Sequence, residues 1–234
     1  MSLVVLRHAP LVRFWSDRGL LDVSPPAEAL VERLGDWLDV RQAIALHQLL
    51  GQESVEPASD QAVIRNPGRS TELPAIMAQL RDEILTNRPA PGLWRNPMPE
   101  TPAQKPADWP ELWEPYRRYM VDHQKQMGLI LGRERRRLRQ ALSGCPGIGV
   151  TLAAMDAAFE RAIGPKESQW LSVLPLYTEQ YLRQLLADAE IHDTPFQQIM
   201  RTFERDLRLA LVHELDLRAQ PVLGLLETLT SLFP

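Results

Sequence analysis

One stretch of the sequence decides the fold, residues 111–142, which read ELWEPYRRYMVDHQKQMGLILGRERRRLRQAL. Its apolar side chains recur every three or four residues, the spacing that places them on one face of an α-helix. The pattern predicts a single helix much longer than the average of about 11–12 residues. Such a helix either spans a whole domain or pairs with a second helix along its length. The apolar series is Leu112, Trp113, Tyr116, Met120, Met127, Ile130, Leu131, Leu138 and Leu142.

The remaining sequence also favours helix. The chain holds 37 leucines against 22 valines and isoleucines combined, and aromatic residues make up only 6%. Leucine favours α-helix, whereas β-branched and aromatic residues favour strands. We therefore predict an all-α fold, a helical bundle with a long central helix and a smaller N-terminal helical subdomain. Apolar spacing predicts its other helices over 11–18, 24–38, 39–50, 71–87, 151–163, 170–186, 194–218 and 222–232.

Prolines and glycines mark where several of these helices should end. Gly164 and Pro165 close the helix that starts at Thr151, because proline lacks the backbone N–H and glycine favours a helix end. Pro175 falls inside the next predicted helix and should kink it. Pro221 should separate the last two helices.

A proline-rich segment divides the chain. Residues 88–110 hold seven prolines, too many for regular structure and typical of an extended connection. We predict an N-terminal helical subdomain over residues 1–87, this proline-rich connection over 88–110, and a C-terminal helical bundle over 111–234.

Composition excludes several classes of protein. Charged residues make up 24% of the chain and the net charge is -4, which fits neither a disordered acidic chain nor a broadly basic nucleic-acid binder. A single cysteine, Cys145, excludes an internal disulfide, and the five histidines are too scattered for a structural zinc site. No apolar run reaches the roughly 18–20 residues of a membrane span, and the start resembles no signal peptide. We expect a cytoplasmic protein with no membrane insertion, no metal and no cofactor.

The N-terminal residues 3–9, LVVLRHA, resemble the start of the histidine phosphatase superfamily. The resemblance implies that His8 attacks phosphorus, that Arg7 neutralises the phosphate oxygens and that a later histidine, His213, completes the pocket. The family continues with Gly and then Glu or Gln, where this chain has Ala9 and Pro10. The alternating strands and helices of that family's sheet are also missing. An enzyme of this class is therefore the second alternative, and no catalytic residue is assigned.

An arginine run lies near the end of the long predicted helix, with five arginines among seven residues (133–139). Arginines around a helix can contact the phosphates of a nucleic acid or an anionic lipid surface. They also suit a solvated or protein-facing surface, and no aromatic residues are interleaved for stacking on bases. Nucleic-acid binding through this run is the first alternative function.

Three further stretches point to a family: ERLGDWL (32–38) followed by AIAL (43–46), YRRY (116–119) at the head of the long helix, and HELDLR (213–218) with QPVLGLL (220–226). In this order they resemble an uncharacterised family of proteobacterial helical proteins, domain of unknown function 3348. The resemblance implies a cytoplasmic bacterial protein encoded near envelope components of OmpA-like and proton-channel-like type. It implies no activity and supplies no catalytic residues.

These observations favour a non-enzymatic cytoplasmic adaptor or assembly protein that acts through helix-mediated protein–protein contacts. Long helices with methionine and tyrosine side chains offer adaptable apolar surface. We expect a protein partner, with an envelope-associated complex and a second copy of the chain as candidates, and do not expect nucleic acid. The predicted interaction residues are Tyr116, Tyr119, Met120, Met127, Arg133, Arg135, Arg136, Arg137 and Arg139.

Overall fold

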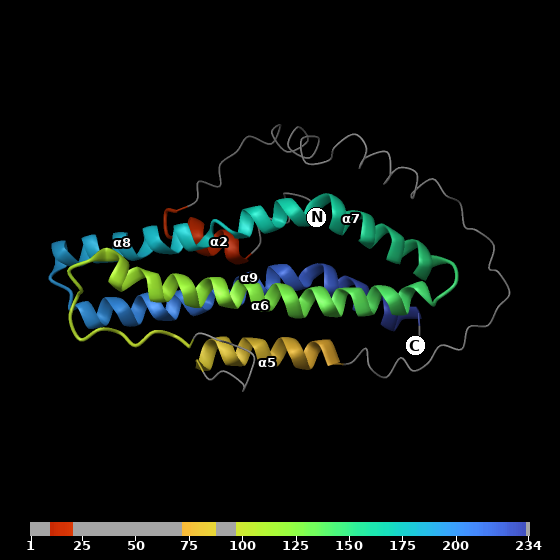
Figure 1. Ribbon diagram of the computed structural model, residues 1–234, viewed down its shortest axis with the longest axis horizontal. Helices are drawn as coiled ribbons and strands as arrows, with labels where there is room; N and C mark the ends of the chain where they lie inside the picture. Colours follow the sequence, from red (N-terminus) through yellow and green to blue (C-terminus); the bar gives the residue numbers. More distant parts are fainter. Residues whose placement is uncertain (1–9, 21–71, 88–96, 233–234) are drawn as a thin grey trace. The chain divides into compact units, whose positions relative to one another are not determined.

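The computed structural model describes residues 10–20, 72–87 and 97–232, and every regular element in these ranges is an α-helix (Figure 1). The predicted all-α fold is confirmed, and α6 is the predicted long helix. The helices predicted over 24–38 and 39–50 lie outside the described residues. The helices are α2 (Pro10–Ser16), α5 (Glu72–Thr86), α6 (Trp109–Ser143), α7 (Ile148–Leu171), α8 (Leu174–His192) and α9 (Phe196–Leu232).

The short helix α2 ends in a left-handed turn. Gly19 has φ +70°, and its N–H donates to Ser16 O at 2.9 Å. The N–H of Leu20 donates to Trp15 O at 3.0 Å, so the last carbonyls of the helix are satisfied. Glycine adopts this conformation without a steric penalty, which explains why the predicted helix stops here.

Two predictions about prolines are wrong. No helix ends at Pro165, and Pro175 does not kink a helix, because it lies where α8 begins. α7 continues through Pro165 to Leu171. Ala162 and Leu171, on either side of the proline, are both buried, so packing outweighs the hydrogen bond that proline removes. Helix α7 ends at Leu171. Pro175 lies in the first turn of α8, where its missing N–H costs little.

The predicted separation of two helices at Pro221 is also wrong. α9 continues through this proline to Leu232. Ala219 and Val222 flank the proline and are both buried, at 0% and 2% exposure. Apolar burial on both sides therefore keeps the helix continuous although one backbone hydrogen bond is missing.

The described residues form two compact units. Unit 1 contains residues 10–20, 76–87, 97–130 and 172–218. In this unit α6 and α9 run parallel, because Tyr116 contacts Phe203 (ring centroids 5.2 Å apart) and Gln124, further along α6, bonds Glu214, further along α9. The buried core of the unit includes Trp15, Leu80, Ile84, Tyr116, Tyr119, Met120, Met127, Leu182, Met200, Phe203, Leu207 and Leu211.

Unit 2 contains residues 72–75, 131–171 and 219–232. A tight turn joins α6 to α7, and Gly147 in this turn has φ +77°. A Cβ atom on Gly149 would lie 2.6 Å from the Cβ of Cys145 and 2.7 Å from the carbonyl oxygen of Leu142, so only glycine fits this close approach. The buried core of the unit includes Leu131, Leu138, Leu142, Cys145, Ala153, Ala162, Val222, Leu225, Leu226 and Leu229.

The described part of the predicted proline-rich connection, residues 97–108, has no regular structure and lies on unit 1. Met98 is buried, and its N–H donates to Asn87 Oδ1 at 3.2 Å. Gln197 on α9 donates to the carbonyl oxygen of Pro102 at 2.6 Å. The described helices on both sides of this connection share unit 1, but the predicted three-part division stays a prediction because residues 21–71 lie outside the described part.

Candidate functional site

The arginine run on α6 is held by carboxylates of α7. Arg135 forms a two-pronged contact with Asp156, with Nη2 2.7 Å from Oδ1 and Nε 3.0 Å from Oδ2. Arg139 bonds the same carboxylate at 2.9 Å and also bonds Glu160. All three side chains of the Asp156 cluster, Arg135, Asp156 and Arg139, are less than one-fifth exposed. Two arginines of the run therefore tie α6 to α7 inside unit 2.

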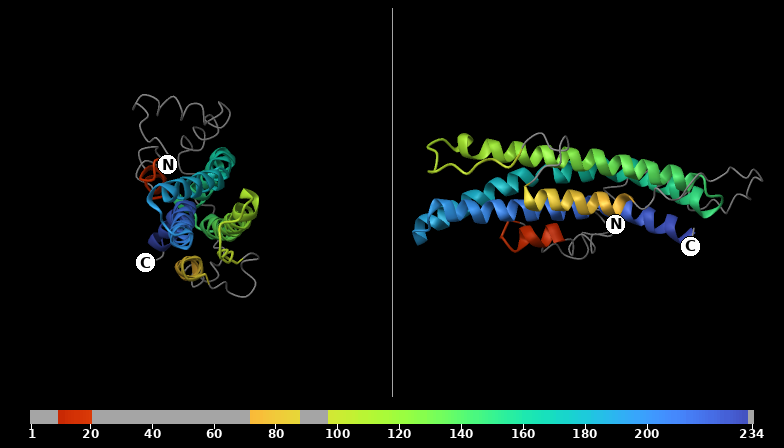
Figure 2. Two further views of the ribbon diagram at one scale, coloured as in Figure 1. Left: turned by 90° about the vertical axis from the view of Figure 1, so that its left-hand side faces the viewer. Right: turned by 90° about the horizontal axis from the view of Figure 1, so that it is seen from below.

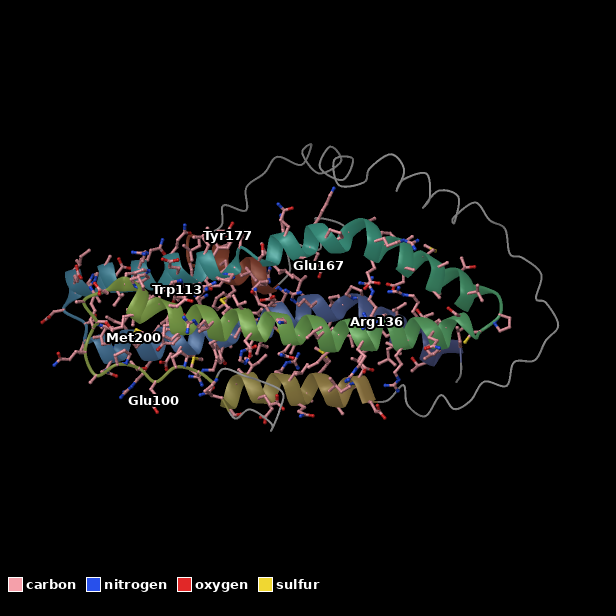
Figure 3. All side chains as sticks on the ribbon, viewed as in Figure 1. Glu100, Trp113, Arg136, Glu167, Tyr177 and Met200 are labelled. Atoms are coloured by element: carbon pink, nitrogen blue, oxygen red, sulfur yellow. The ribbon has the colours of Figure 1, made fainter. Side chains whose placement is uncertain are left out.

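The other three arginines differ in exposure. Arg137 bonds Glu72 of α5 at 3.2 Å and Glu134 at 3.0 Å. Arg133 is 70% exposed and lies 3.6 Å from Glu134. Arg136, labelled in Figure 3, is also exposed. Of the predicted cationic interaction residues, the structure thus leaves Arg133 and Arg136 as the most accessible.

The α7 partners of the arginine run carry a sequence signal that the predicted arginine surface does not include. Asp156 and Glu160 are four residues apart, a spacing that places both on one face of a helix. Two acids on one face of a helix that follows a basic helix after a tight turn can meet its arginines. Such a pairing removes two arginines of the run from the predicted anion-binding surface.

The four predicted apolar interaction residues lie in the core of unit 1. Tyr116, Tyr119, Met120 and Met127 are each at most 1% exposed. The hydroxyl of Tyr116 donates to Glu204 of α9 at 2.8 Å, and burial is the main cause that raises its pKa. The prediction that these side chains form an exposed surface is therefore corrected, because they lie on the inward stripe of α6.

The outward side of α6 carries a different set of apolar side chains in unit 1. Val121 is 41% exposed and Leu129 is 58% exposed. The exposed Lys125 lies between them, and a spacing of four residues places all three along one side of the helix. We call Val121, Lys125 and Leu129 the α6 ridge. Neither Val121 nor Leu129 belongs to the apolar stripe predicted from the sequence. Their position outside that stripe is the sequence signal for an exposed location.

A second candidate site lies where α2 packs on α8 and α9 in unit 1 (Figures 1 and 2). α2 buries Leu11, Phe14 and Trp15, at 3%, 6% and 1% exposure. The centres of the Trp15 and Tyr181 rings lie 6.2 Å apart, and the two rings are nearly perpendicular. Two turns after Leu11, Arg18 places its guanidinium 3.5 Å from the centre of the Phe14 ring and 5.3 Å from that of Tyr181.

Asp206 of α9 anchors this contact. Its Oδ2 accepts hydrogen bonds from Arg18 Nη2 at 2.8 Å and from the Tyr181 hydroxyl at 2.5 Å, and its Oδ1 accepts one from Arg205 at 3.1 Å. Burial by itself would raise the pKa of Asp206, but the bonds from Tyr181 and Arg18 outweigh it and lower the pKa below its ordinary value. The carboxylate therefore stays charged and selects a cation at this position.

The α2 contact leaves polar atoms without partners. Among the described residues, the buried side-chain atoms that make no hydrogen bond are Trp15 Nε1, Arg18 Nε, Tyr119 Oη and His213 Nδ1. Trp15, Arg18 and His213 belong to the surroundings of α2, and the His213 ring lies 5.7 Å from that of Phe14. Each such atom costs about 1–3 kcal/mol of unmade hydrogen bonding. The helix is therefore well packed but incompletely hydrogen-bonded.

Of the residues of the phosphatase hypothesis, the structure describes His213. Arg7 and His8 lie outside the described residues. His213 lies in the middle of α9, and burial is the main cause that lowers its pKa. Within residues 10–20, 72–87 and 97–232, no group of three or more His, Cys, Asp or Glu side chains could hold a metal ion. No helix in the same ranges is long and apolar enough to cross a membrane.

Comparison with known proteins supplies one match. The model of the family described as "Protein of unknown function (DUF3348)" matches residues 6–231. The chain belongs to this family. The DUF3348 match covers the motifs that suggested it, including residues 32–38 and 213–226. No curated protein and no solved structure matches the chain. Any function of this DUF3348 chain must therefore be argued from its own geometry.

Proposed function

We propose that the chain is a non-enzymatic adaptor or assembly protein of the bacterial cytoplasm that binds a protein partner through the α6 ridge. One observation carries the proposal. Val121 and Leu129 are exposed aliphatic side chains on one side of a helix whose opposite side is fully packed. An amphipathic partner helix could cover such a ridge, with a carboxylate opposite Lys125.

The packing of α6 favours the α6 ridge as the binding surface over the tyrosines and methionines that the sequence predicted. Tyr116, Tyr119, Met120 and Met127 fix α6 within unit 1, so the ridge is presented on a rigid element. A rigid helix face loses little conformational freedom when a partner binds. An envelope-associated complex or a second copy of the chain remains the candidate partner.

Nucleic-acid binding remains the alternative, and the exposure of Arg133 and Arg136 favours it. Phosphate contacts by these two side chains would make binding sensitive to salt. Glutamate at both positions should then abolish retention on DNA at low salt. Retention that these substitutions leave unchanged would exclude the alternative, and so would a wild-type chain that does not bind DNA.

Photo-crosslinking in bacterial cells tests the adaptor proposal. A photoreactive amino acid replaces Leu129 in one variant and Ile191, a 76% exposed residue on α8, in a matched control. We expect the Leu129 position to give an adduct with one defined protein and the Ile191 position to give none. Adding Val121→Glu should remove the adduct. The new carboxylate places a charge in the apolar contact and repels the carboxylate that the partner helix presents to Lys125.

Two results would overturn the adaptor proposal. The first is the same set of adducts from the Leu129 and Ile191 positions, since that pattern reports collisions at any exposed site. The second is an adduct that survives Val121→Glu in a variant with unchanged circular dichroism. An adduct with the chain itself would identify the partner as a second copy.

A further inference from the structure

We propose that Tyr181, Asp206 and His213, on α8 and α9, form a docking surface for a partner helix that carries two adjacent aromatic residues and an arginine one turn later. In the structure α2 occupies this surface, so α2 acts as its ligand within the chain. The surface lies apart from the α6 ridge and does not depend on the function proposed for that ridge. We call these three residues the α2-docking surface.

The anchors of α2 follow the pattern of a helix bound on a protein surface. Leu11, Phe14 and Trp15 stand at positions i, i+3 and i+4 of α2, and Arg18 follows at i+7 in the turn after Ser16, the spacing by which an amphipathic helix presents one face to a receptor. The first three are buried, and Arg18 is ion-paired. A seven-residue helix is too short to be stable alone in water, so its helical form depends on these contacts.

The chemistry of the docking surface specifies arginine at the last anchor. The guanidinium of Arg18 lies over the Phe14 ring of α2 and near the Tyr181 ring of the surface, while its Nη2 bonds Asp206. A planar guanidinium can stack and donate a hydrogen bond at the same time, whereas a lysine ammonium cannot stack. The Tyr181 hydroxyl and Arg205 hold the Asp206 carboxylate in place for this cation.

Incomplete hydrogen bonding makes α2 a replaceable ligand. Trp15 Nε1, Arg18 Nε and His213 Nδ1 are buried without partners. A partner helix that offers an acceptor to its own arginine, or a group that pairs with His213, would bind more favourably than α2. Such a helix still competes with a segment of the same chain, which benefits from a high effective concentration. Exchange is thus reserved for partners that match the surface better.

A labelled synthetic peptide with the sequence of residues 9–20 serves as the probe. Its binding to the full-length chain is measured by fluorescence anisotropy. The wild-type chain should bind it weakly, because its own α2 occupies the surface. A full-length variant with Trp15→Ala and Arg18→Ala should bind it about tenfold or more tightly, because its own α2 lacks two anchors. A peptide with Arg18→Glu should not bind that variant.

A charge exchange tests the contact between Arg18 and Asp206 directly. We call the variant with Trp15→Ala and Arg18→Ala the α2-weakened variant. When Asp206→Arg is added to it, binding of the wild-type peptide should be lost. A peptide with Arg18→Asp should then bind. Asp188→Arg, at an exposed position on α8, is the matched control and should leave binding of the wild-type peptide unchanged.

The result that overturns the inference is a folded, α2-weakened variant that does not bind the wild-type peptide or binds the Arg18→Glu peptide equally well. If the double variant does not fold, Arg18→Ala alone keeps the aromatic anchors and should still bind the peptide more tightly than the wild-type chain does. No gain in that variant would also overturn the inference. Neither result affects the α6 ridge, whose test uses separate residues.

Discussion

Three carboxylates with little solvent exposure, Glu214, Asp206 and Asp156, are each held by more than one partner. Glu214, which is 0% exposed, accepts a hydrogen bond from Arg218 at 2.7 Å and one from Gln124 of α6 at 3.0 Å. Asp206 in unit 1 and Asp156 in unit 2 likewise bond several donors. Leaving a buried carboxylate unpaired costs more than an exposed ion pair contributes. These acids therefore specify which helices pair, as the apolar stripes alone would not.

A buried histidine should make the stability of the chain depend on pH. His123 is 2% exposed, and burial is the main cause that lowers its pKa to about 4. The unfolded chain binds a proton near pH 6.5, so stability is lost as pH falls from there towards 4. The loss from this residue should reach about 3 kcal/mol. Urea unfolding at a series of pH values measures it.

Two variants assign this pH dependence. His123→Phe removes the titrating group, so its free energy of unfolding should fall less than that of the wild-type chain between pH 6.5 and 4. His192→Phe, at the exposed end of α8, should keep the wild-type slope. Equal slopes in the wild-type chain and the His123→Phe variant would contradict this assignment.

At the level of the helices, sequence periodicity predicted what depends on local spacing. The starts and ends of α2 and α5 and the length of α6 followed from apolar stripes and from residues such as Gly19. The course of α7 through Pro165 did not, because burial on both sides of a proline depends on neighbouring helices. The candidate sites were less predictable, since the Asp156 cluster and the contact of α2 with Asp206 join residues far apart in sequence.

Continuity of α9 through Pro221 gives a prediction about helix stability. Pro221→Ala restores a backbone N–H inside the helix, and proline in a helix interior costs about 3 kcal/mol. The variant chain gains conformational freedom when unfolded, which offsets about 1 kcal/mol, so we expect a net stabilisation of about 1–2 kcal/mol. Pro175→Ala, in the first turn of α8, is the control and should not stabilise the chain. Urea midpoints compare them, and an unchanged or lower midpoint for Pro221→Ala would show that packing requires the proline.

At the level of the whole molecule, each compact unit is assembled from separate parts of the sequence. Among the described residues, unit 1 is built from four segments, 10–20, 76–87, 97–130 and 172–218. Unit 2 is built from three, 72–75, 131–171 and 219–232. Residues of α5 belong to both units: Glu72 pairs with Arg137 within unit 2, and Arg81 pairs with Asp216 within unit 1. Each core therefore includes side chains from segments distant in sequence, and we expect that neither core forms from one continuous stretch.

The fragment 111–234 tests this consequence, because it corresponds to the C-terminal bundle expected from the sequence. It keeps nearly all of α6 and the whole of α7, α8 and α9 but lacks α2 and α5, whose buried side chains include Trp15, Leu73, Leu80 and Ile84. Their removal exposes the apolar surfaces that they cover, so we expect a lower urea midpoint and self-association in light scattering. A monomeric fragment that unfolds cooperatively at the midpoint of the full chain would contradict this expectation. That result would instead support a separable N-terminal subdomain, since α2 and α5 would then contribute nothing to the stability of the bundle.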